Sequence, residues 1–400
     1  MAIANSSNFL RRLGSAPLFA LGFRPFYLLA AVFALVALPC WVVSFFGGMQ
    51  TGGYLHGIAW HSHEMIFGFA PAVIAGFLLT AVRNWTGQPT PTGWPLIGLA
   101  VLWLVGRVLI VVGPAHAAAA IDAVFLPALG IAVAIPIWRS KNTRNYKVLA
   151  VLAVLALANL AYHLASLDLL PREIVRIAIS AALDVIAILI AIIGGRVIPV
   201  FIGNAIENAE PRHNASVEFL AVGSLVFILC LGVLQPMLTM SRTVWLVLLV
   251  TAAVGHTIRL ALWQPLRARA NPLLWMLPAA YAWLPVYLAL RAMSLLDITV
   301  MSASVHALTV GAIASLMVAM MARSALGHTG RALVAGWAEI SAFALLQVAA
   351  IVRVVASSFA SGVYREAMIV SAMLWTMAFA VFLYRYWPIL TRPRIDGRPG

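Results

Sequence analysis

Residues 58–82 form a long apolar stretch that reads IAWHSHEMIFGFAPAVIAGFLLTAV. As a helix it is long enough to cross the roughly 30 Å hydrocarbon core of a bilayer. Glu64, His61 and His63 stand inside this otherwise apolar run. An ionisable group at mid-bilayer costs roughly 2.5–3.5 kcal/mol, so such groups usually face a protein interior and mark an ion path or a cofactor site. The stretch therefore predicts a membrane-spanning helix that carries a site.

The rest of the chain has the same membrane-like composition. Of its 400 residues, 63% are hydrophobic and 10% are charged, whereas a soluble domain carries about 25% charged residues. The apolar runs are too long and continuous to be the alternating strands of an outer-membrane barrel, so helices are expected. We predict an all-α polytopic membrane protein of about twelve helices, forming a single transmembrane domain over 1–400. The predicted spans are 21–46, 58–82, 95–113, 118–138, 147–166, 173–201, 216–234, 243–263, 271–291, 300–322, 332–357 and 366–388.

The basic residues predict how the chain lies in the membrane. A net charge of +14 would suit nucleic acid, but these residues gather in alternate loops, which is the positive-inside pattern and excludes a nucleic-acid partner. The bias predicts both termini in the cytoplasm, with four outer basic residues: Arg172, Arg242, Arg291 and Arg365. The inner basic residues are Arg11, Arg12, Arg83, Arg139, Lys141, Arg144, Lys147, Arg212, Arg267, Arg269, Arg323, Arg331, Arg385, Arg392, Arg394 and Arg398.

Several cofactor and targeting classes are excluded. Arg11 and Arg12 precede an apolar stretch that is too long for a signal peptide, so an uncleaved first helix is expected. Cys40 and Cys230 are the only cysteines and no CxxCH motif occurs, so any haem would be held non-covalently. The chain also lacks a P-loop, and ATP is not expected to drive it directly.

The predicted topology sets the depth of the polar side chains. The candidate haem or metal ligands His61, His63 and His306 are expected at a similar depth near the outer surface. Asn159 and His163 stand one turn apart near the outer end of their helix. The residues expected either to bind a metal or to contact a metal-ligating side chain are Glu64, Met65, His163 and His256. The polar partners expected in the outer half are Arg107, Asp122, Arg176 and Asp184.

The helical period separates the two histidines of the 58–82 stretch. At about 100° per residue, His61 shares a face with Glu64 and Met65, while His63 points about 200° away. One undistorted helix therefore cannot aim both histidines at one metal, which indicates either two sites or one ligand with a hydrogen-bonding partner. The alternative is that these imidazoles only hydrogen-bond their helix neighbours.

Two distant segments share a spacing pattern. The matched pairs are His63 with His306, Gly68 with Gly311, Thr86 with Thr329, and Gly87 with Gly330. We interpret the pattern as a weak internal repeat of 58–87 and 300–330, with coincidence as the alternative. A repeat would place the two histidines at matching depth, as two axial ligands of one haem require.

Polar motifs also end helices at the predicted cytoplasmic surface. Arg196, His328 and Arg331 lie in such motifs, at 195–199 and 326–331. One interpretation is helix termination by Gly and Pro, with arginines reaching lipid phosphates. The other is a pocket for an anion or a haem propionate.

Six motifs, taken in order, resemble the NnrS family over nearly the whole chain. They are FRPF at 23–26, WHSHEM at 60–65 followed by Gly-Phe-Ala, NWTG at 84–87, GRVIP at 195–199, HALTVG at 306–311 and LGHTGR at 326–331. The resemblance implies a bacterial multi-pass inner-membrane protein that carries haem and copper and acts in the response to nitric oxide and nitrosative stress, often beside denitrification. The positions that match the family motifs are His61, His63, Glu64, Arg196, His306, His328 and Arg331. The family's histidine before the Tyr281-Ala282-Trp283 segment is absent here, where Met276-Leu277-Pro278 stands, so no metal role transfers to that position.

The expected function is accordingly that of a metalloprotein in the lipid bilayer. We expect haem b and copper between helices in the outer half, with nitric oxide or a nitrosyl species as ligand. Whether the protein is an enzyme and which electron donor serves it are left open. The alternatives are a secondary transporter of a small anion or metabolite, and a non-catalytic sensor of haem or nitric oxide or a haem-handling partner.

Overall fold

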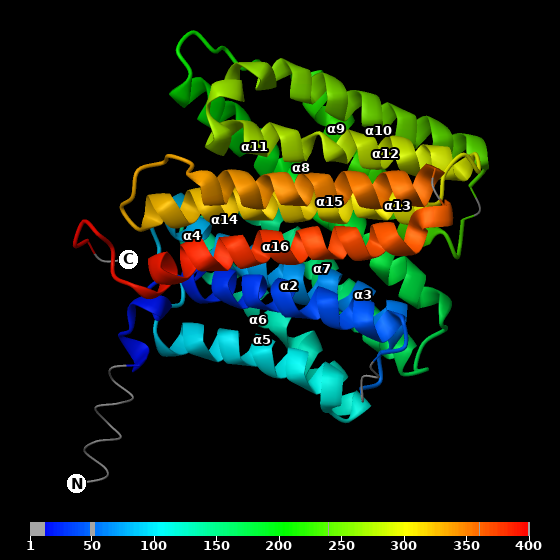
Figure 1. Cartoon of the computed structure of the whole chain (residues 1–400), viewed down its shortest axis with the longest axis horizontal. Coiled ribbons are helices and arrows are strands. Elements are labelled where there is room, and N and C mark those ends of the chain that lie inside the picture. The colour runs from blue at the N-terminus through cyan, green and yellow to red at the C-terminus, as the bar shows by residue number, and fades with distance from the viewer. Residues whose placement is uncertain (1–12, 49–52, 239, 360, 399–400) are drawn as a thin grey trace. The chain divides into compact units, whose positions relative to one another are not determined.

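The computed structural model describes residues 13–48, 53–238, 240–359 and 361–398. Arg11, Arg12 and part of the 47–57 loop therefore lie outside the described residues. Within the described ranges the regular elements are helices (Figure 1). Twelve helices there are long and apolar enough to cross a membrane, which confirms the all-α, twelve-helix prediction. The sidedness of the termini stays a prediction.

The spanning helices follow one another with short connections. Their bounds are α2 (Phe23–Phe45); α3 (Gly57–His63), η2 (Glu64–Phe69) and α4 (Ala70–Thr86); α5 (Trp94–Val112); α6 (Ala115–Arg139); α7 (Tyr146–Ser166); α8 (Glu173–Ala205); α9 (Ala215–Leu234); α10 (Arg242–Leu262); α11 (Pro272–Tyr281) and α12 (Trp283–Leu295); α13 (Met301–His306), η5 (Ala307–Ala314) and α14 (Ser315–His328); α15 (Trp337–Phe359); and α16 (Tyr364–Thr391). Short 3-10 turns lie at Pro17–Phe19 (η1), Thr143–Asn145 (η3), Pro265–Ala270 (η4) and Ser361–Val363 (η6).

The helices form two compact units. The first unit comprises 1–179, 321–333 and 382–400, and the second comprises 180–320 and 334–381. In the first unit α2 and α6 pack against α4, and α5 and α7 pack against α6. In the second unit α9 and α12 pack against α10, and α15 packs against α13 and η5. The prediction of a single domain over 1–400 stays a prediction.

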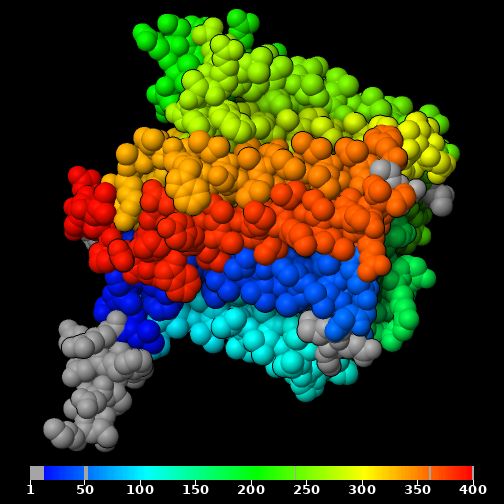
Figure 2. All heavy atoms as spheres, viewed as in Figure 1, coloured from blue at the N-terminus to red at the C-terminus, as the bar shows by residue number. Residues whose placement is uncertain are grey.

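Small and large side chains divide between the inside and the outside of the helices. On α2, the side chains of Ala30, Ala31 and Ala34 are fully buried, so neighbouring backbones approach closely. On α5, coloured cyan in Figure 2, Leu104 and Val108 are about half exposed. Large apolar side chains on the outer surface are stable against lipid rather than water, as a membrane span requires.

Two spans change their helical pitch directly after a histidine. η2 and η5 are π-helical and begin at the residues that follow His63 and His306. At the end of η2 the N–H of Ala70 donates to the carbonyl of Met65, five residues back. The next residue, Pro71, has no N–H to continue the normal ladder, which favours the wider turn. π-helical segments occur frequently at functional sites.

The two spans also end alike. The hydroxyls of Thr86 and Thr329 each donate to the carbonyl four residues back, at 2.6 Å. Gly87 (φ +65°) and Gly330 (φ +77°) follow in the left-handed region, which glycine adopts freely. The same spacing pairs Gly93-Trp94 with Gly336-Trp337. The internal repeat of 58–87 and 300–330 stays a prediction.

Candidate metal centre

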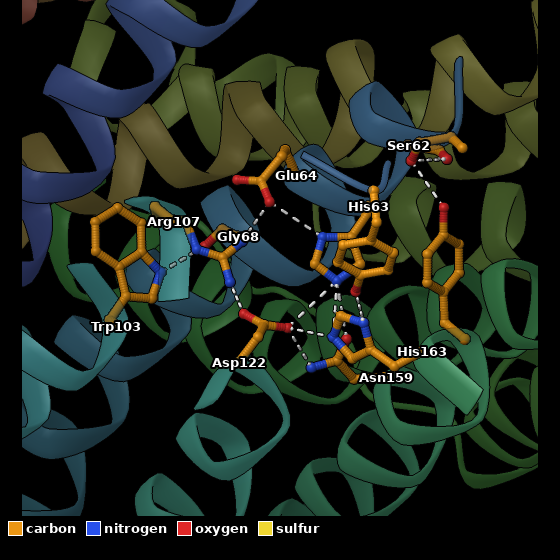
Figure 3. A network of polar contacts seen from close by, with 12 residues as sticks. Ser62, His63, Glu64, Gly68, Trp103, Arg107, Asp122, Asn159 and His163 are labelled. Carbon is orange, nitrogen blue, oxygen red and sulfur yellow. Dashed lines mark hydrogen bonds and ion pairs between the residues drawn. The ribbon is translucent and has the colours of Figure 1, made fainter. Parts of the chain in front are cut away.

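A group of buried polar side chains lies inside the first unit (Figure 3). Four spans supply it. The members are His63 at the end of α3, Glu64 at the start of η2, Arg107 on α5, Asp122 on α6, and Asn159 and His163 on α7. We call these six residues the polar group. Buried ionisable groups persist in an apolar interior only when they pair with one another or with an ion.

Three members of the polar group bring together atoms that could ligate a metal. His163 Nε2 lies 2.8 Å from Asp122 Oδ2. His63 Nε2 lies 3.3 Å from the same oxygen and 3.3 Å from His163 Nε2. A metal about 2.0–2.2 Å from nitrogen and oxygen ligands would separate tetrahedral ligands by about 3.3–3.6 Å. Two of the three separations match and the third is shorter, so the triangle His63–Asp122–His163 fits a metal ion.

Hydrogen bonds behind the triangle set the orientation of its rings. His63 Nδ1 lies 3.1 Å from Glu64 Oε1, and His63 Nε2 lies 3.2 Å from Asn159 Oδ1. In the tautomer whose Nδ1–H donates to Glu64, the Nε2 lone pair faces the triangle. His163 Nδ1 makes a short hydrogen bond with the hydroxyl of Tyr54. The Asn159 amide donates to Asp122 Oδ2 at 2.9 Å. A carboxylate or hydroxyl behind each imidazole is typical of metal-ligating histidines.

Arg107 connects the two carboxylates of the polar group. Its Nη1 donates to Glu64 Oε1 at 2.8 Å, and its Nη2 pairs with Asp122 Oδ1. The guanidinium also lies over the Trp103 ring, 5.8 Å from the centroid. One guanidinium faces two carboxylates, so that with both ionised one negative charge would be left to be balanced in a low-dielectric interior. A cation at the triangle would balance it.

The π-helical turn makes room for this arginine. A Cβ at Gly68 would lie 2.6 Å from Arg107 Nη1, closer than real Cβ contacts allow, and 3.1 Å from Glu64 Oε2, which is a tight contact. The Gly68 carbonyl accepts from Trp103 Nε1 at 3.0 Å. Glu64 Oε2 itself is buried and has no hydrogen-bond partner among the described residues. Glycine therefore leaves the space in which the arginine crosses the helix, and a Cβ there would displace the flexible end of Arg107.

Tyr54 covers the polar group from the loop that precedes α3. It lies outside the spanning segments, and burial is the main cause that raises the pKa of its hydroxyl. The hydroxyl consequently stays neutral at physiological pH and acts as a hydrogen-bonding group beside His163.

Three other predicted residues of the first unit do not join the triangle. The His61 ring stacks on Trp41, with centroids 4.0 Å apart. Met65 is half-buried in η2, and Arg176 is exposed on α8. Of the two arginines expected in the outer half, Arg107 pairs with Glu64.

Three predicted residues belong to the second unit. His306 Nδ1 lies 2.7 Å from the carbonyl of Ser302, to which its N–H donates. Asp184 accepts from Arg291 at 2.6 Å and from Tyr287 at 3.0 Å. His256 Nδ1 lies 2.6 Å from the hydroxyl of Tyr281. A haem shared by His306 and a histidine of the first unit stays a prediction.

The residues predicted for an inner anion pocket also divide between the units. Arg196 is half-buried on α8 in the second unit. His328 ends α14 in the first unit, where its ring packs 5.6 Å from that of Phe23. Arg331 follows in the connection to α15. One pocket formed by all three stays a prediction.

Asn159 and Tyr54, which surround the triangle, were predicted only in part from the sequence. Asn159 was expected beside His163 because of their spacing by four residues, but that spacing did not indicate its contact with Asp122. Tyr54 was missed, since it lies in a loop and no periodic pattern reports on it.

Comparison with known proteins places the chain. A search of curated proteins gave no match. The sequence model of the NnrS protein family matches residues 17–394. Two of the motifs that resemble the family, at 60–65 and 306–311, contain His63 and His306. Because the family match covers nearly the whole chain, this protein belongs to the NnrS family.

Proposed function

We propose that His63, Asp122 and His163 hold a copper ion at which the protein binds nitric oxide or a nitrosyl species. Membership of the NnrS family supports a membrane protein linked to the nitric oxide response. The observation that carries the proposal is the triangle of donor atoms, with separations of 2.8, 3.3 and 3.3 Å. Each donor is buried, and each is positioned by a further hydrogen bond or ion pair.

The donor types narrow the choice of metal. Imidazole ligands suit copper, iron and zinc, and two imidazoles with one carboxylate also suit non-haem ferrous iron. A redox metal here would supply a coordination position for nitric oxide and exchange of one electron. Glu64 would orient His63, and Arg107 would hold Asp122 Oδ1 so that Oδ2 faces the triangle. We choose copper because the family resemblance implies it.

The surroundings suit a small apolar ligand. The ring of His63 packs against Phe67 and Tyr162, with centroids 5.4 and 5.1 Å away. These aromatic walls exclude water from one side of the triangle. Nitric oxide is neutral and dissolves in lipid, so it can reach a buried intramembrane site without an aqueous channel.

For the second cofactor we propose that His306 is an axial ligand of haem b. Its Nδ1–H donates to the Ser302 carbonyl, which leaves the lone pair on Nε2, the form that binds iron. Replacing His306 by alanine should remove or shift the Soret band. An unchanged spectrum with full haem content would exclude this residue.

Nitric oxide binding tests the main proposal. Reduced, purified protein to which nitric oxide is added should show an infrared N–O stretch from a non-haem metal nitrosyl. If haem is also present, a second N–O stretch at a different frequency should appear. Asp122→Asn keeps the shape of the side chain but removes the charged ligand, so the non-haem band should disappear. Asp168→Asn is the control and should retain it. A stable, colourless, metal-free protein would instead favour the secondary transporter, and nitric oxide binding without turnover would favour a sensor.

We also propose a bacterial inner-membrane location with both termini in the cytoplasm, supported by the bias of the basic residues. Fusion reporters should place the loops at 139–147 and 323–331 in the cytoplasm and the loop at 47–57 outside. An external loop at 139–147 would contradict this topology.

A further inference from the structure

A buried arginine lies in the second unit, where α15 meets the start of α16. Arg353 is 6% exposed. It stands within the last two turns of α15, which ends at Phe359, so it is roughly 10 Å or less from the end of the helix. Charged side chains buried in an apolar span normally pair with an opposite charge. The partners of this arginine therefore decide how its charge is balanced.

The partners of Arg353 are neutral. Its Nη1 donates to Ser357 Oγ at 2.9 Å, and its Nη2 donates to the hydroxyl of Tyr364 at 2.8 Å. The guanidinium carbon also lies 4.8 Å from the centroid of the Tyr364 ring. All 12 acidic residues of the chain fall within the described ranges, and none of them forms an ion pair with Arg353 there. We call Arg353, Ser357 and Tyr364 the Arg353 site.

Other arginines in the spans have a carboxylate partner. Three of them pair at 2.5–2.8 Å, namely Arg107 with Glu64, Arg259 with Glu218, and Arg291 with Asp184. An ion pair of this kind offsets part of the cost of removing a charge from water. Arg353 is buried without such a pair among the described residues, which indicates that its counter-ion comes from outside the chain.

The Arg353 site offers hydrogen-bond donors. A guanidinium carries five N–H groups, and acceptors among the described residues take two of those of Arg353. Ser357 Oγ donates its own proton to the carbonyl of Arg353 at 2.7 Å. The Tyr364 hydroxyl accepts from Arg353, and no described residue accepts the proton of that hydroxyl. A ligand at this site must therefore accept hydrogen bonds and carry negative charge.

We propose that the Arg353 site binds a small planar oxyanion, of the class that includes carboxylates, nitrite and nitrate. The guanidinium fork presents parallel N–H donors that match two oxygens in one plane. The Tyr364 hydroxyl lies beside this fork and can donate to the same ligand. The site shares no residue with the proposed metal centre, and either proposal can fail without the other.

The test is calorimetric titration of the detergent-solubilised full chain with sodium nitrate. HEPES buffer at constant ionic strength, with a bulky sulfonate as the other anion, avoids competing small anions. The wild type should bind nitrate in a saturable way. Arg353→Gln should bind it about 10- to 100-fold more weakly, the loss expected for a hydrogen bond between charged partners. Equal binding by Arg353→Gln and wild type would overturn the site.

Two further variants and a control sharpen this result. Arg353→Lys keeps the charge but not the planar fork, so it should also bind nitrate more weakly than the wild type. Tyr364→Phe loses one donor and should bind nitrate about 5-fold more weakly. Arg172→Gln removes an exposed arginine and should bind nitrate like the wild type. Full affinity in Arg353→Lys would show that charge alone suffices, which contradicts a planar ligand held by the fork.

Thermal unfolding checks the counter-ion argument. In nitrate-free buffer Arg353→Gln lacks the unbalanced charge, so it should be at least as stable as the wild type. Nitrate should then stabilise the wild type and leave Arg353→Gln unchanged. If Arg353→Gln is clearly less stable in nitrate-free buffer and nitrate has no effect on the wild type, Arg353 only supports packing and the proposal fails.

Competition defines the ligand class. Nitrite and formate should displace nitrate, whereas spherical chloride should displace it much less effectively at the same concentration. Equal displacement by chloride would contradict a planar ligand. Loss of nitrate binding in nanodiscs that contain phosphatidylglycerol, but not in those of phosphatidylcholine alone, would make a lipid phosphate the occupant and overturn the small-anion proposal.

Discussion

The spans around His63 and His306 share a backbone but differ in chemistry. In each, a π-helical segment follows the histidine, and a side chain from a neighbouring helix crosses the helix at a glycine five residues later. At Gly68 that side chain is Arg107, and at Gly311 it is Trp283. The charged crossing belongs to the polar group, whereas the indole crossing belongs to a neutral set of hydrogen bonds.

The neutral set is as well connected as the charged one. Trp283 Nε1 donates to Gln347 Oε1 at 2.8 Å, and the Gln347 amide donates to Ser315 Oγ at 2.6 Å. Ser315 Oγ in turn donates to the carbonyl of Val310, inside η5. In both spans the π-helical turn and its glycine provide the space, and the side chain that crosses there determines whether the space holds charge.

The largest difference is expected when the crossing side chains are replaced. Arg107→Met leaves Glu64 and Asp122 as buried carboxylates without their guanidinium, and should destabilise metal-free protein by about 3–5 kcal/mol. Trp283→Phe keeps an aromatic ring but loses the indole N–H and part of the ring volume, which should cost about 1–2 kcal/mol. Thermal unfolding with a copper chelator present measures both.

A rescue variant checks the cause of that loss. Adding Glu64→Gln and Asp122→Asn to Arg107→Met removes the unpaired charges and should recover most of the lost stability. If the triple variant is no more stable than Arg107→Met, the loss of stability comes from packing, and the unpaired carboxylates are not its cause.

The second prediction concerns the carboxylate behind His63. Glu64→Gln keeps an oxygen that accepts from Arg107 but weakens the acceptor for His63 Nδ1–H. Copper affinity should fall about 10 to 100-fold, the usual effect of losing such a partner. Gln347→Leu in the neutral set is the control and should leave copper affinity unchanged. Equal affinity in Glu64→Gln and wild type, measured by chelator competition over pH 6 to 8, would assign Glu64 a structural role only.

The third prediction separates stability from metal binding at the two glycines. Gly311→Ala places a methyl group against the rigid indole of Trp283 and should cost about 1–3 kcal/mol with copper content unchanged. Gly68→Ala displaces the flexible end of Arg107, so it should disturb the polar group and lower copper content as well. Copper loss in both variants, or in neither, would mean that the two crossings do not differ as described.

The smallest effect is expected outside both spans. Asp168 and Arg172 form an exposed pair at 2.8 Å, and the hydrogen bond from Arg172 lowers the pKa of the Asp168 carboxyl. A lowered pKa contributes stability above the unfolded-state pKa, and that contribution is lost as the pH falls through the folded-state value. Asp168→Asn should therefore leave unfolding unchanged at neutral pH, to within measurement, because solvent screens the pair. A clear change in unfolding at neutral pH would show that this exposed ion pair contributes more to stability than solvent screening allows.

Hydropathy was sufficient to predict the twelve spans, because long apolar runs have one stable form in lipid. It also identified Arg107 and Asp122 as polar partners, from their expected depth. It did not show which helices are neighbours, so the meeting of His163 with Asp122, and of Asp184 with Arg291, became visible only in the structure. The π-helical turns were not predicted, because a regular period of about 100° per residue does not reveal a local change of pitch.

The metal content per chain tests whether the triangle His63–Asp122–His163 binds copper. Copper and iron per chain should be measured in wild type, His163→Ala, Asp122→Asn and His306→Ala, each purified in the same way. We expect stoichiometric copper in the wild type and in His306→Ala, and loss of copper from the other two variants, which keep their haem. Stoichiometric copper in both His163→Ala and Asp122→Asn would contradict a metal centre at the triangle His63–Asp122–His163.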